Sequence, residues 1–173
     1  MAEALEQLSQ LLRRPANPIG TGFGDQWSTA ERSLGTTLPN DYKSFITAYG
    51  VGSINDKVWI LSPFAPVLML QLAHRLAWHR ESHEVMRQYG EPNGLIPWAD
   101  NDDRGMCFWD TSDNDPDAWT VVTVLEDDIR RWPENMTTFL AKVLEGEHLS
   151  AVFGSDATFN VPIDYVPWSS SSA

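Results

Sequence analysis

Apolar residues in the first part of the chain recur at helical spacing. Leucines at three- and four-residue intervals over residues 3–14 predict a short helix with one apolar face. After a loop rich in proline and glycine, a second helix is expected to begin at Asp25 or Ser28, where Ser28 and Glu31 have the spacing of a capping box. This helix should end at Gly35, because glycine tolerates the left-handed conformation of a helix C-cap.

Two further helices and a strand follow in the pattern. Residues 39–49 carry aromatic and aliphatic side chains at helical intervals, and residues 58–61 have the composition of a strand. The longest helical pattern covers residues 67–89, and Gly90 and Pro92 are expected to terminate it. Its stripe consists of Leu68, Leu72, Leu76, His79, His83 and Met86.

The second half of the chain alternates short β-type runs with turn-rich connectors, which is typical of an antiparallel meander. The expected strands are residues 95–98, 105–110 and 119–125, and the connectors are residues 100–104 and 111–117. A final core helix is predicted over residues 135–144. Residues 158–168 are expected to add an edge strand or to wrap over the core. No internal repeat and no domain boundary interrupts the pattern, which predicts an α+β fold in a single domain.

Composition is consistent with one folded domain. The chain has 173 residues, of which 42% are hydrophobic, and this is enough to bury a sizeable core. Its eight tryptophans supply large packing surfaces, and we expect Trp98, Trp109 and Trp119 to be substantially buried. The single cysteine, Cys107, cannot form an intramolecular disulfide and lies in an apolar run, so a buried, inert thiol is expected there.

The sequence lacks the pattern of a membrane or secreted protein. The first residues have no basic stretch followed by an apolar run, so they do not resemble a signal peptide. The longest apolar region, residues 63–72, is short and is broken by prolines and Gln71, whereas a spanning helix needs about 18 or more apolar residues. A cytoplasmic protein is therefore expected.

Charge narrows the range of partners. Twelve basic residues against 24 acidic ones give a net charge of -12, which argues against nucleic acid and anionic lipid as partners. Ten of the acidic residues lie between Asp100 and Asp128, and within that segment only Arg104 opposes them. A solvated surface and a partner-binding surface both remain open for this segment. The candidate partner-binding residues lie in its two connectors and are Asp100, Asp102, Asp103, Asp113, Asp115 and Asp117.

Candidate metal and catalytic motifs are incomplete. His79 and His83 have the i, i+4 spacing of a zinc pair, but no third ligand accompanies them, so a structural role is favoured. Asp113, Asp115 and Asp117 imitate the start of a calcium loop. That loop would need a glycine and a glutamate where this chain has alanine and valine, so an EF-hand is rejected. We predict no catalytic residue, no metal and no cofactor.

Two stretches resemble the SUKH superfamily of Smi/Knr-like proteins. The first is Trp27-x3-Glu31-x2-Leu34-Gly35-x2-Leu38-Pro39-x-Asp41-Tyr42-x2-Phe45-x3-Tyr49-Gly50-x-Gly52-x-Ile54. The second begins with Gly94-Leu95-Ile96-Pro97-Trp98, continues through Gly105 to Trp109 and Trp119-Thr120-Val121-Val122, and closes with Met136-Thr137-x-Phe139-Leu140 and Leu144-x-Gly146. The family-like core covers about residues 25–147 and leaves residues 148–173 as a variable tail.

The resemblance implies a fold and a function. The family fold is a twisted, mainly antiparallel sheet flanked by helices. Bacterial members are commonly immunity proteins of toxin systems, including nuclease toxins, and fungal members regulate cell-wall synthesis. The resemblance carries no catalytic motif, so we expect a non-catalytic immunity protein that binds and neutralises a cognate toxin, with nucleases among the expected partners.

Two alternatives stay open. One is a Smi/Knr-like regulatory or adaptor protein, and the other is a small-ligand binder or enzyme that uses a cleft beside the sheet. Fold-level resemblance does not by itself assign a function. The sequence pattern does not define an oligomeric state.

Overall fold

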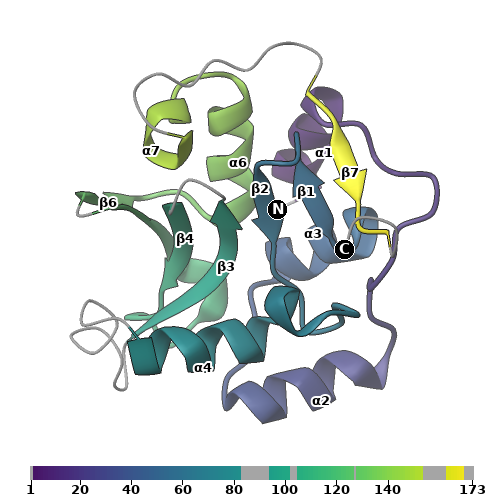
Figure 1. Ribbon diagram of the computed structural model, residues 1–173, viewed down its shortest axis with the longest axis vertical. Coiled ribbons are helices and arrows are strands. Elements are labelled where there is room, and N and C mark those ends of the chain that lie inside the picture. The colour runs from purple at the N-terminus through teal and green to yellow at the C-terminus, as the bar shows by residue number, and fades with distance from the viewer. Residues whose placement is uncertain (1, 83–93, 102–104, 127, 154–162, 170–173) are drawn as a thin grey trace.

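Helices and one antiparallel sheet make up the part of the protein that the structure describes. The computed structural model describes residues 2–82, 94–101, 105–126, 128–153 and 163–169 (Figure 1). The α-helices are α1 (Ala2–Leu11), α2 (Asp25–Leu34), α3 (Asn40–Tyr49), α4 (Leu72–Ser82), α6 (Met136–Leu144) and α7 (Leu149–Phe153). Two short 3-10 helices are η1 (Leu68–Leu70) and η2 (Pro116–Ala118). This arrangement confirms the predicted α+β class.

The sheet has seven strands in the order β6-β5-β4-β3-β2-β1-β7, and every neighbouring pair is antiparallel. Its strands are β1 (Gly52–Ile54), β2 (Val58–Ile60), β3 (Leu95–Asn101), β4 (Gly105–Asp110), β5 (Thr120–Leu125), β6 (Asp128–Trp132) and β7 (Tyr165–Pro167). Figure 1 shows β7 beside β1, at the side of the sheet opposite β6. The predicted meander is confirmed, and so is an edge strand within residues 158–168, of which 158–162 lie outside the described residues.

Successive residues of β4 face different helices, because side chains along a strand alternate between the two faces of a sheet. Trp109 points toward α3, with its ring 4.9 Å from that of Tyr42, and Phe108 points toward α4, 5.9 Å from the ring of His79. The α3 side also holds Trp98, whose ring packs edge-on against Phe139 of α6. The predicted burial of the three tryptophans is confirmed, because Trp98 and Trp109 are 0% exposed and Trp119 is 4% exposed.

The beginning of α3 is tied to the beginning of α6 by a buried carboxylate. Asp41 is 5% exposed, and one of its oxygens accepts hydrogen bonds from the backbone N–H and the hydroxyl of Thr137, at 3.0 and 3.2 Å. The other oxygen accepts the N–H of Tyr42 at 2.8 Å. These bonds satisfy N–H groups in the first turns of two helices, which have no partner within their own helix. Burial raises the pKa of Asp41, although the hydrogen bonds oppose the rise.

The second helix begins at Asp25, one of the two expected starts, and ends at Gly35 in the predicted left-handed conformation, with φ of 74°. The predicted capping box of Ser28 and Glu31 is wrong, because both residues lie inside α2. Glu31 instead accepts the backbone N–H of Leu38 at 2.9 Å and pairs with Lys43 at 2.8 Å. Its carboxylate therefore holds the corner between α2 and α3.

The predicted continuous helix over residues 67–89 is wrong in its first part. Val67 and Gln71 are extended, with η1 between them, and α4 begins only at Leu72. The reason is that this segment bonds back to Ser62, whose N–H donates to Leu70 and whose carbonyl accepts from Leu72. Leu68 is consequently 62% exposed instead of joining the apolar stripe. Residues 83–89 lie outside the described residues.

Candidate functional site

The connector between β4 and β5, residues 111–119, carries three of the candidate aspartates and is called the acidic connector below. Asp113, Asp115 and Asp117 are all exposed. Asp113 accepts the N–H of Asp115 at 2.8 Å, and Asp115 accepts the N–H of Asp117 at 3.0 Å and so caps η2. The indole N–H of Trp119 donates to the carbonyl of Asp113 at 2.8 Å, which fixes the connector to a buried ring. The carboxylates are therefore held in place by the connector itself.

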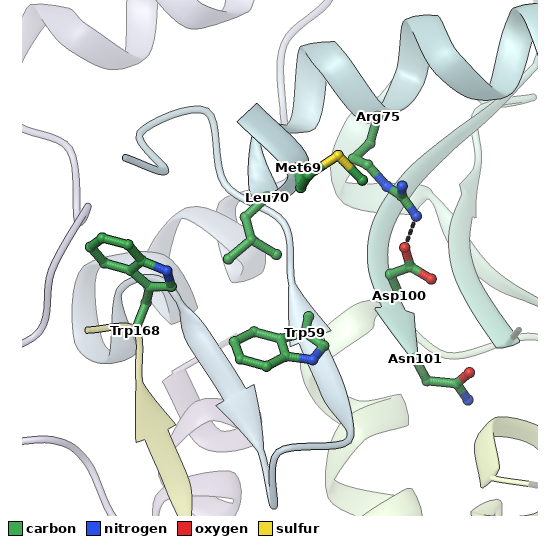
Figure 2. A pocket seen from close by; sticks show the side chains of 7 residues that line it. All are labelled: Trp59, Met69, Leu70, Arg75, Asp100, Asn101 and Trp168. Carbon is green, nitrogen blue, oxygen red and sulfur yellow. Dashed lines mark ion pairs between the residues drawn. The ribbon is translucent and has the colours of Figure 1, made fainter. Parts of the chain in front are cut away.

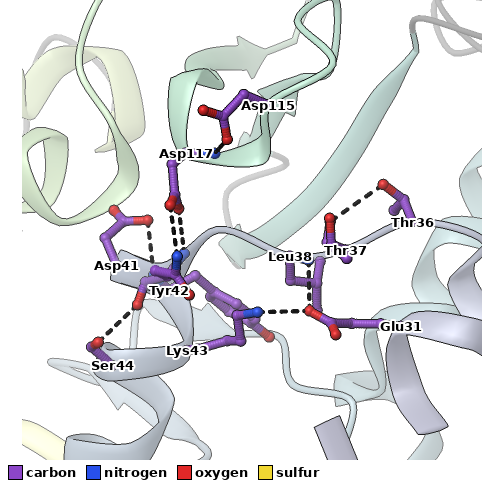
Figure 3. A network of polar contacts seen from close by, with 11 residues as sticks. Glu31, Thr36, Thr37, Leu38, Asp41, Tyr42, Lys43, Ser44, Asp115 and Asp117 are labelled. Carbon is purple, nitrogen blue, oxygen red and sulfur yellow. Dashed lines mark hydrogen bonds and ion pairs between the residues drawn. The ribbon is translucent and has the colours of Figure 1, made fainter. Parts of the chain in front are cut away.

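Asp117 has a further bond that the sequence analysis missed. One carboxylate oxygen accepts the backbone N–H of Asn40 at 2.7 Å, and the other accepts the Asn40 side-chain amide at 2.6 Å (Figure 3). Asn40 is the first residue of α3, so the acidic connector supplies an acceptor to the beginning of that helix. The two residues are 77 positions apart, and no local sequence signal links them.

Two members of the acidic segment pair with basic residues that lie just beyond it in sequence. Asp110 pairs with Arg131 of β6. Asp128 pairs with Arg130, also of β6, at 2.6 Å. The negative field is consequently weaker along the β5–β6 side than the sequence count implies.

The six candidate aspartates do not lie in one described patch. Asp100 is within β3 rather than in a connector, and it pairs with Arg75 of α4. It lies opposite Met106 near the start of β4, whereas the acidic connector follows the end of that strand. A six-residue strand separates these positions by roughly 20 Å. Asp102 and Asp103 lie outside the described residues.

The remaining candidates have structural surroundings. His79 is 0% exposed and lies between α4 and the sheet, against Phe108, while His83 lies outside the described residues. Burial raises the pKa of the Cys107 thiol, so the thiol stays protonated near neutral pH and is not a nucleophilic thiolate. Within the described ranges, no group of three or more His, Cys, Asp or Glu side chains could hold a metal ion. Nor does any helix in those ranges have the length and apolar character needed to cross a membrane.

The helices, the antiparallel sheet and the helix corner at Leu38 define an α+β protein. A family model described as SUKH_6, SMI1-KNR4 cell-wall, matches residues 24–140. That match covers more than half of the 173 residues, and the chain belongs to this SUKH family. No curated protein matches the chain.

Some elements of the described structure lie inside the family match and others lie outside it. It begins beside α2 and ends within α6, so it contains β1 to β6, the acidic connector and α4. Helices α1 and α7 and strand β7 lie outside it. The edge strand β7 nevertheless pairs with β1, so a segment outside the matched region completes the sheet that the matched region forms.

Proposed function

We propose that this protein is a non-catalytic, cytoplasmic immunity protein that binds and neutralises a cognate protein toxin. Membership of the SUKH family supports this function, and so does the net charge of -12. A toxin that acts on nucleic acid carries a basic surface for phosphate, and an acidic protein face can occupy that surface. Nuclease toxins are therefore the partners that this charge fits best.

The observation that carries the proposal is the internal bracing of the acidic connector. Asp113 and Asp115 each use one carboxylate oxygen, Oδ1, to hold a backbone N–H, which leaves the second oxygen for a partner. A loop that is already ordered loses less conformational entropy on binding than a loop that must first become ordered. Exposed carboxylates on an ordered loop also raise the association rate with a basic partner.

The test is to identify a toxin domain encoded by a neighbouring gene and to measure whether this chain neutralises it. Cells that express the toxin domain alone should stop growing, and co-expression of this chain should restore growth. The purified proteins should form a complex whose association rate falls as salt rises, because screening weakens attraction between exposed charges. Growth arrest that persists despite co-expression of folded protein would contradict the proposal.

A regulatory or adaptor role is the second candidate function. The matching family description itself refers to the cell wall, which is the observation that favours this role. An adaptor should bind its partner without abolishing that partner's activity. Measuring the partner's activity in the purified complex therefore separates the two functions.

A further inference from the structure

A cavity of about 250 Å³ lies on the α4 side of the sheet. Trp59, Leu70 and Trp168 supply apolar walls, and Arg75 and Asp100 lie at one end, where they form an ion pair (Figure 2). The carboxylate of Asp100 is therefore already paired, and the Nε of Arg75 is buried. The remaining walls are mostly apolar and do not select one occupant over another.

The outer edge of β6 is a more specific surface. This strand is the last one on its side of the sheet, and four of its five residues are exposed (Figure 1). Among the described residues, no strand pairs with its outer side. The opposite edge strand, β7, contains Pro167, and proline has no N–H to donate to a further strand. Strand β6 contains no proline, so its backbone is the better suited of the two edges to pair with another strand.

The backbone of β6 presents one residue outward at the centre of its charged part. Successive residues of a strand direct their N–H and carbonyl groups alternately to the two sides of the strand. The N–H of Val121 in β5 donates to the carbonyl of Glu134, just beyond β6, at 3.1 Å, so every second residue of β5 from Val121 onward bonds toward β6. The register partners of these residues include Asp128 and Arg130, which leaves the N–H and the carbonyl of Ile129 facing outward.

The side chains beside Ile129 carry opposite charges. Asp128 precedes it and Arg130 follows it, and these two side chains are 54% and 46% exposed. When two copies of the strand pair antiparallel about Ile129, Asp128 of each copy lies opposite Arg130 of the other. Opposite charges directly across an antiparallel pair are stabilising, and like charges are destabilising. The sequence Asp-Ile-Arg is therefore complementary to a second copy of itself.

The charges also favour one register over its neighbours. In a symmetric antiparallel pair the two-fold axis passes through a residue, because residues opposite each other must share a face of the sheet. An axis at Asp128, Arg130 or Arg131 would place two like charges directly opposite each other. An axis at Ile129 instead forms two Asp128–Arg130 pairs. Since Asp128 and Arg130 already pair within one copy at 2.6 Å, the four side chains would form one cluster of alternating charge.

We propose that the outer edge of β6 is a contact site for a second copy of this chain, with the two β6 strands paired antiparallel about Ile129. The N–H of each Ile129 donates to the carbonyl of the other, and the two side chains, each 38% exposed in one copy, cover each other. Charged side chains usually protect an edge strand from pairing, but this order of signs admits an identical strand. The contact is short, so the dimer is weak. This proposal involves no toxin and is independent of the proposed function.

The first experiment measures the mass of the full chain in solution by sedimentation. The average mass should rise from 19.5 kDa at about 10 µM toward twice that value at about 1 mM, a range suited to weak association. At about 0.15 M salt the screening length is about 8 Å, so repulsion between two copies of net charge -12 is largely screened while contacting pairs are not. A mass of 19.5 kDa at every concentration would overturn the proposal.

Two charge variants should fail alone and associate together. Asp128→Arg places positive charge on both sides of Ile129, and Arg130→Asp places negative charge on both sides, so each variant should stay monomeric. Their equimolar mixture should form a heterodimer, because each charge again meets its opposite. The control Glu6→Arg makes the same charge change as Asp128→Arg at an exposed position of α1, and it should associate as the wild type does.

A second pair of variants tests the backbone contact. Ile129→Pro removes the outward N–H, which a proline on an edge strand can do without breaking the sheet, and it should weaken association by at least about tenfold. Ile129→Ala keeps that N–H and loses only side-chain contact, so it should weaken association less. Circular dichroism of each variant confirms that it is folded.

Three further results would overturn the proposal. Wild-type association of either single charge variant would show that β6 is not the contact. A mixture of the two folded charge variants that stays monomeric would show that Asp128 and Arg130 do not meet across the contact. Equal weakening by Ile129→Pro and Ile129→Ala would show that the backbone of β6 does not pair.

Discussion

The two faces of the sheet use tryptophan in different ways. On the face covered by α3 and α6, Trp98 and Trp109 are 0% exposed and touch other aromatic rings. On the face covered by α4, Trp59 and Trp168 are half-buried and line a cavity. We call the first the closed face and the second the open face.

The difference shows that one residue type contributes unequally to stability on the two faces of the same sheet. A fully buried indole contributes its whole surface to the folding free energy, whereas a half-buried one keeps part of that surface for another molecule. The closed face should therefore dominate stability, whereas the half-buried tryptophans of the open face should contribute less to it. The predictions below test that division, starting with the largest expected effect.

Truncating a tryptophan should cost much more stability on the closed face. Trp109→Ala removes a ring in contact with Tyr42, Trp98 and Trp119, so the free energy of unfolding should fall by about 3–5 kcal/mol. Trp59→Ala should cost less than half of that, because its ring is partly exposed. Urea unfolding followed by circular dichroism measures both. Similar losses of unfolding free energy for Trp109→Ala and Trp59→Ala would contradict the expected difference between the two faces.

Removing a carboxylate should matter more where it is buried than where it is exposed. Asp41→Ala leaves the N–H of Thr137 buried without its acceptor and should cost about 2 kcal/mol. Asp117→Ala removes an exposed acceptor from the beginning of α3 and should cost about 1 kcal/mol. The same unfolding assay measures both variants, and a larger loss for Asp117→Ala would contradict the ranking.

The pH dependence of stability should have opposite signs at Asp41 and Glu31. Burial raises the folded pKa of Asp41 above its usual value of 3.8, so its contribution is fully present below that value and is lost as pH rises through the folded pKa. At Glu31, burial alone would raise the pKa, but bonds from Lys43 and Leu38 outweigh it and lower the pKa below 4.5. Its contribution is present above that value and is lost as pH falls.

Unfolding measurements between pH 3 and 7 test these signs with two matched variants. The stability advantage of the wild type over Asp41→Asn should shrink as pH rises. The advantage over Glu31→Gln should grow over the same range. Two advantages that change in the same direction would show that the surroundings of one carboxylate are assigned incorrectly.

The smallest effect on stability is expected in the acidic connector. Asp113→Asn keeps an oxygen that can accept the N–H of Asp115, so the free energy of unfolding should change by less than about 0.5 kcal/mol. The association rate of Asp113→Asn with the cognate toxin should nevertheless be lower than that of the wild type at low salt. This difference in rate should disappear at high salt. Stopped-flow binding at two salt concentrations measures this change. An unchanged rate at low salt would remove Asp113 from the partner surface.

Much of the fold could be predicted because its signals are local. Strand β4 reads as an apolar run, and Gly35 marks the end of α2. Strand β6 was missed because its sequence, Asp-Ile-Arg-Arg-Trp, shows no apolar alternation, and four of its five residues are exposed at the sheet edge. The start of α4 was misplaced because Gln71 pairs with Ser62, a tertiary interaction that no helical periodicity reveals.

The candidate site was harder to predict, because its residues meet only after folding. Counting acids between Asp100 and Asp128 identified the charge but not the arginines of β6, which follow that segment in sequence and pair with its members. The cavity on the open face combines Trp59, Arg75, Asp100 and Trp168 from four separate parts of the chain. Each of these residues looks ordinary in its own stretch, so sequence spacing could not group them.

The edge strand β7 has a consequence for how related proteins could diversify. It lies outside the family match and is held by backbone pairing with β1 and by the buried Tyr165, whose ring packs against Phe45 and Tyr49 and whose hydroxyl donates to the carbonyl of Gly50. Backbone pairing does not depend on side-chain identity, so a different sequence that keeps an aromatic residue at the position of Tyr165 could occupy this edge and bring another residue to the position of Trp168. Substitutions confined to β7 and Trp168 would then change one wall of the cavity while residues 24–140 stay unchanged. Related proteins could therefore adapt to a changing partner with little loss of folding stability.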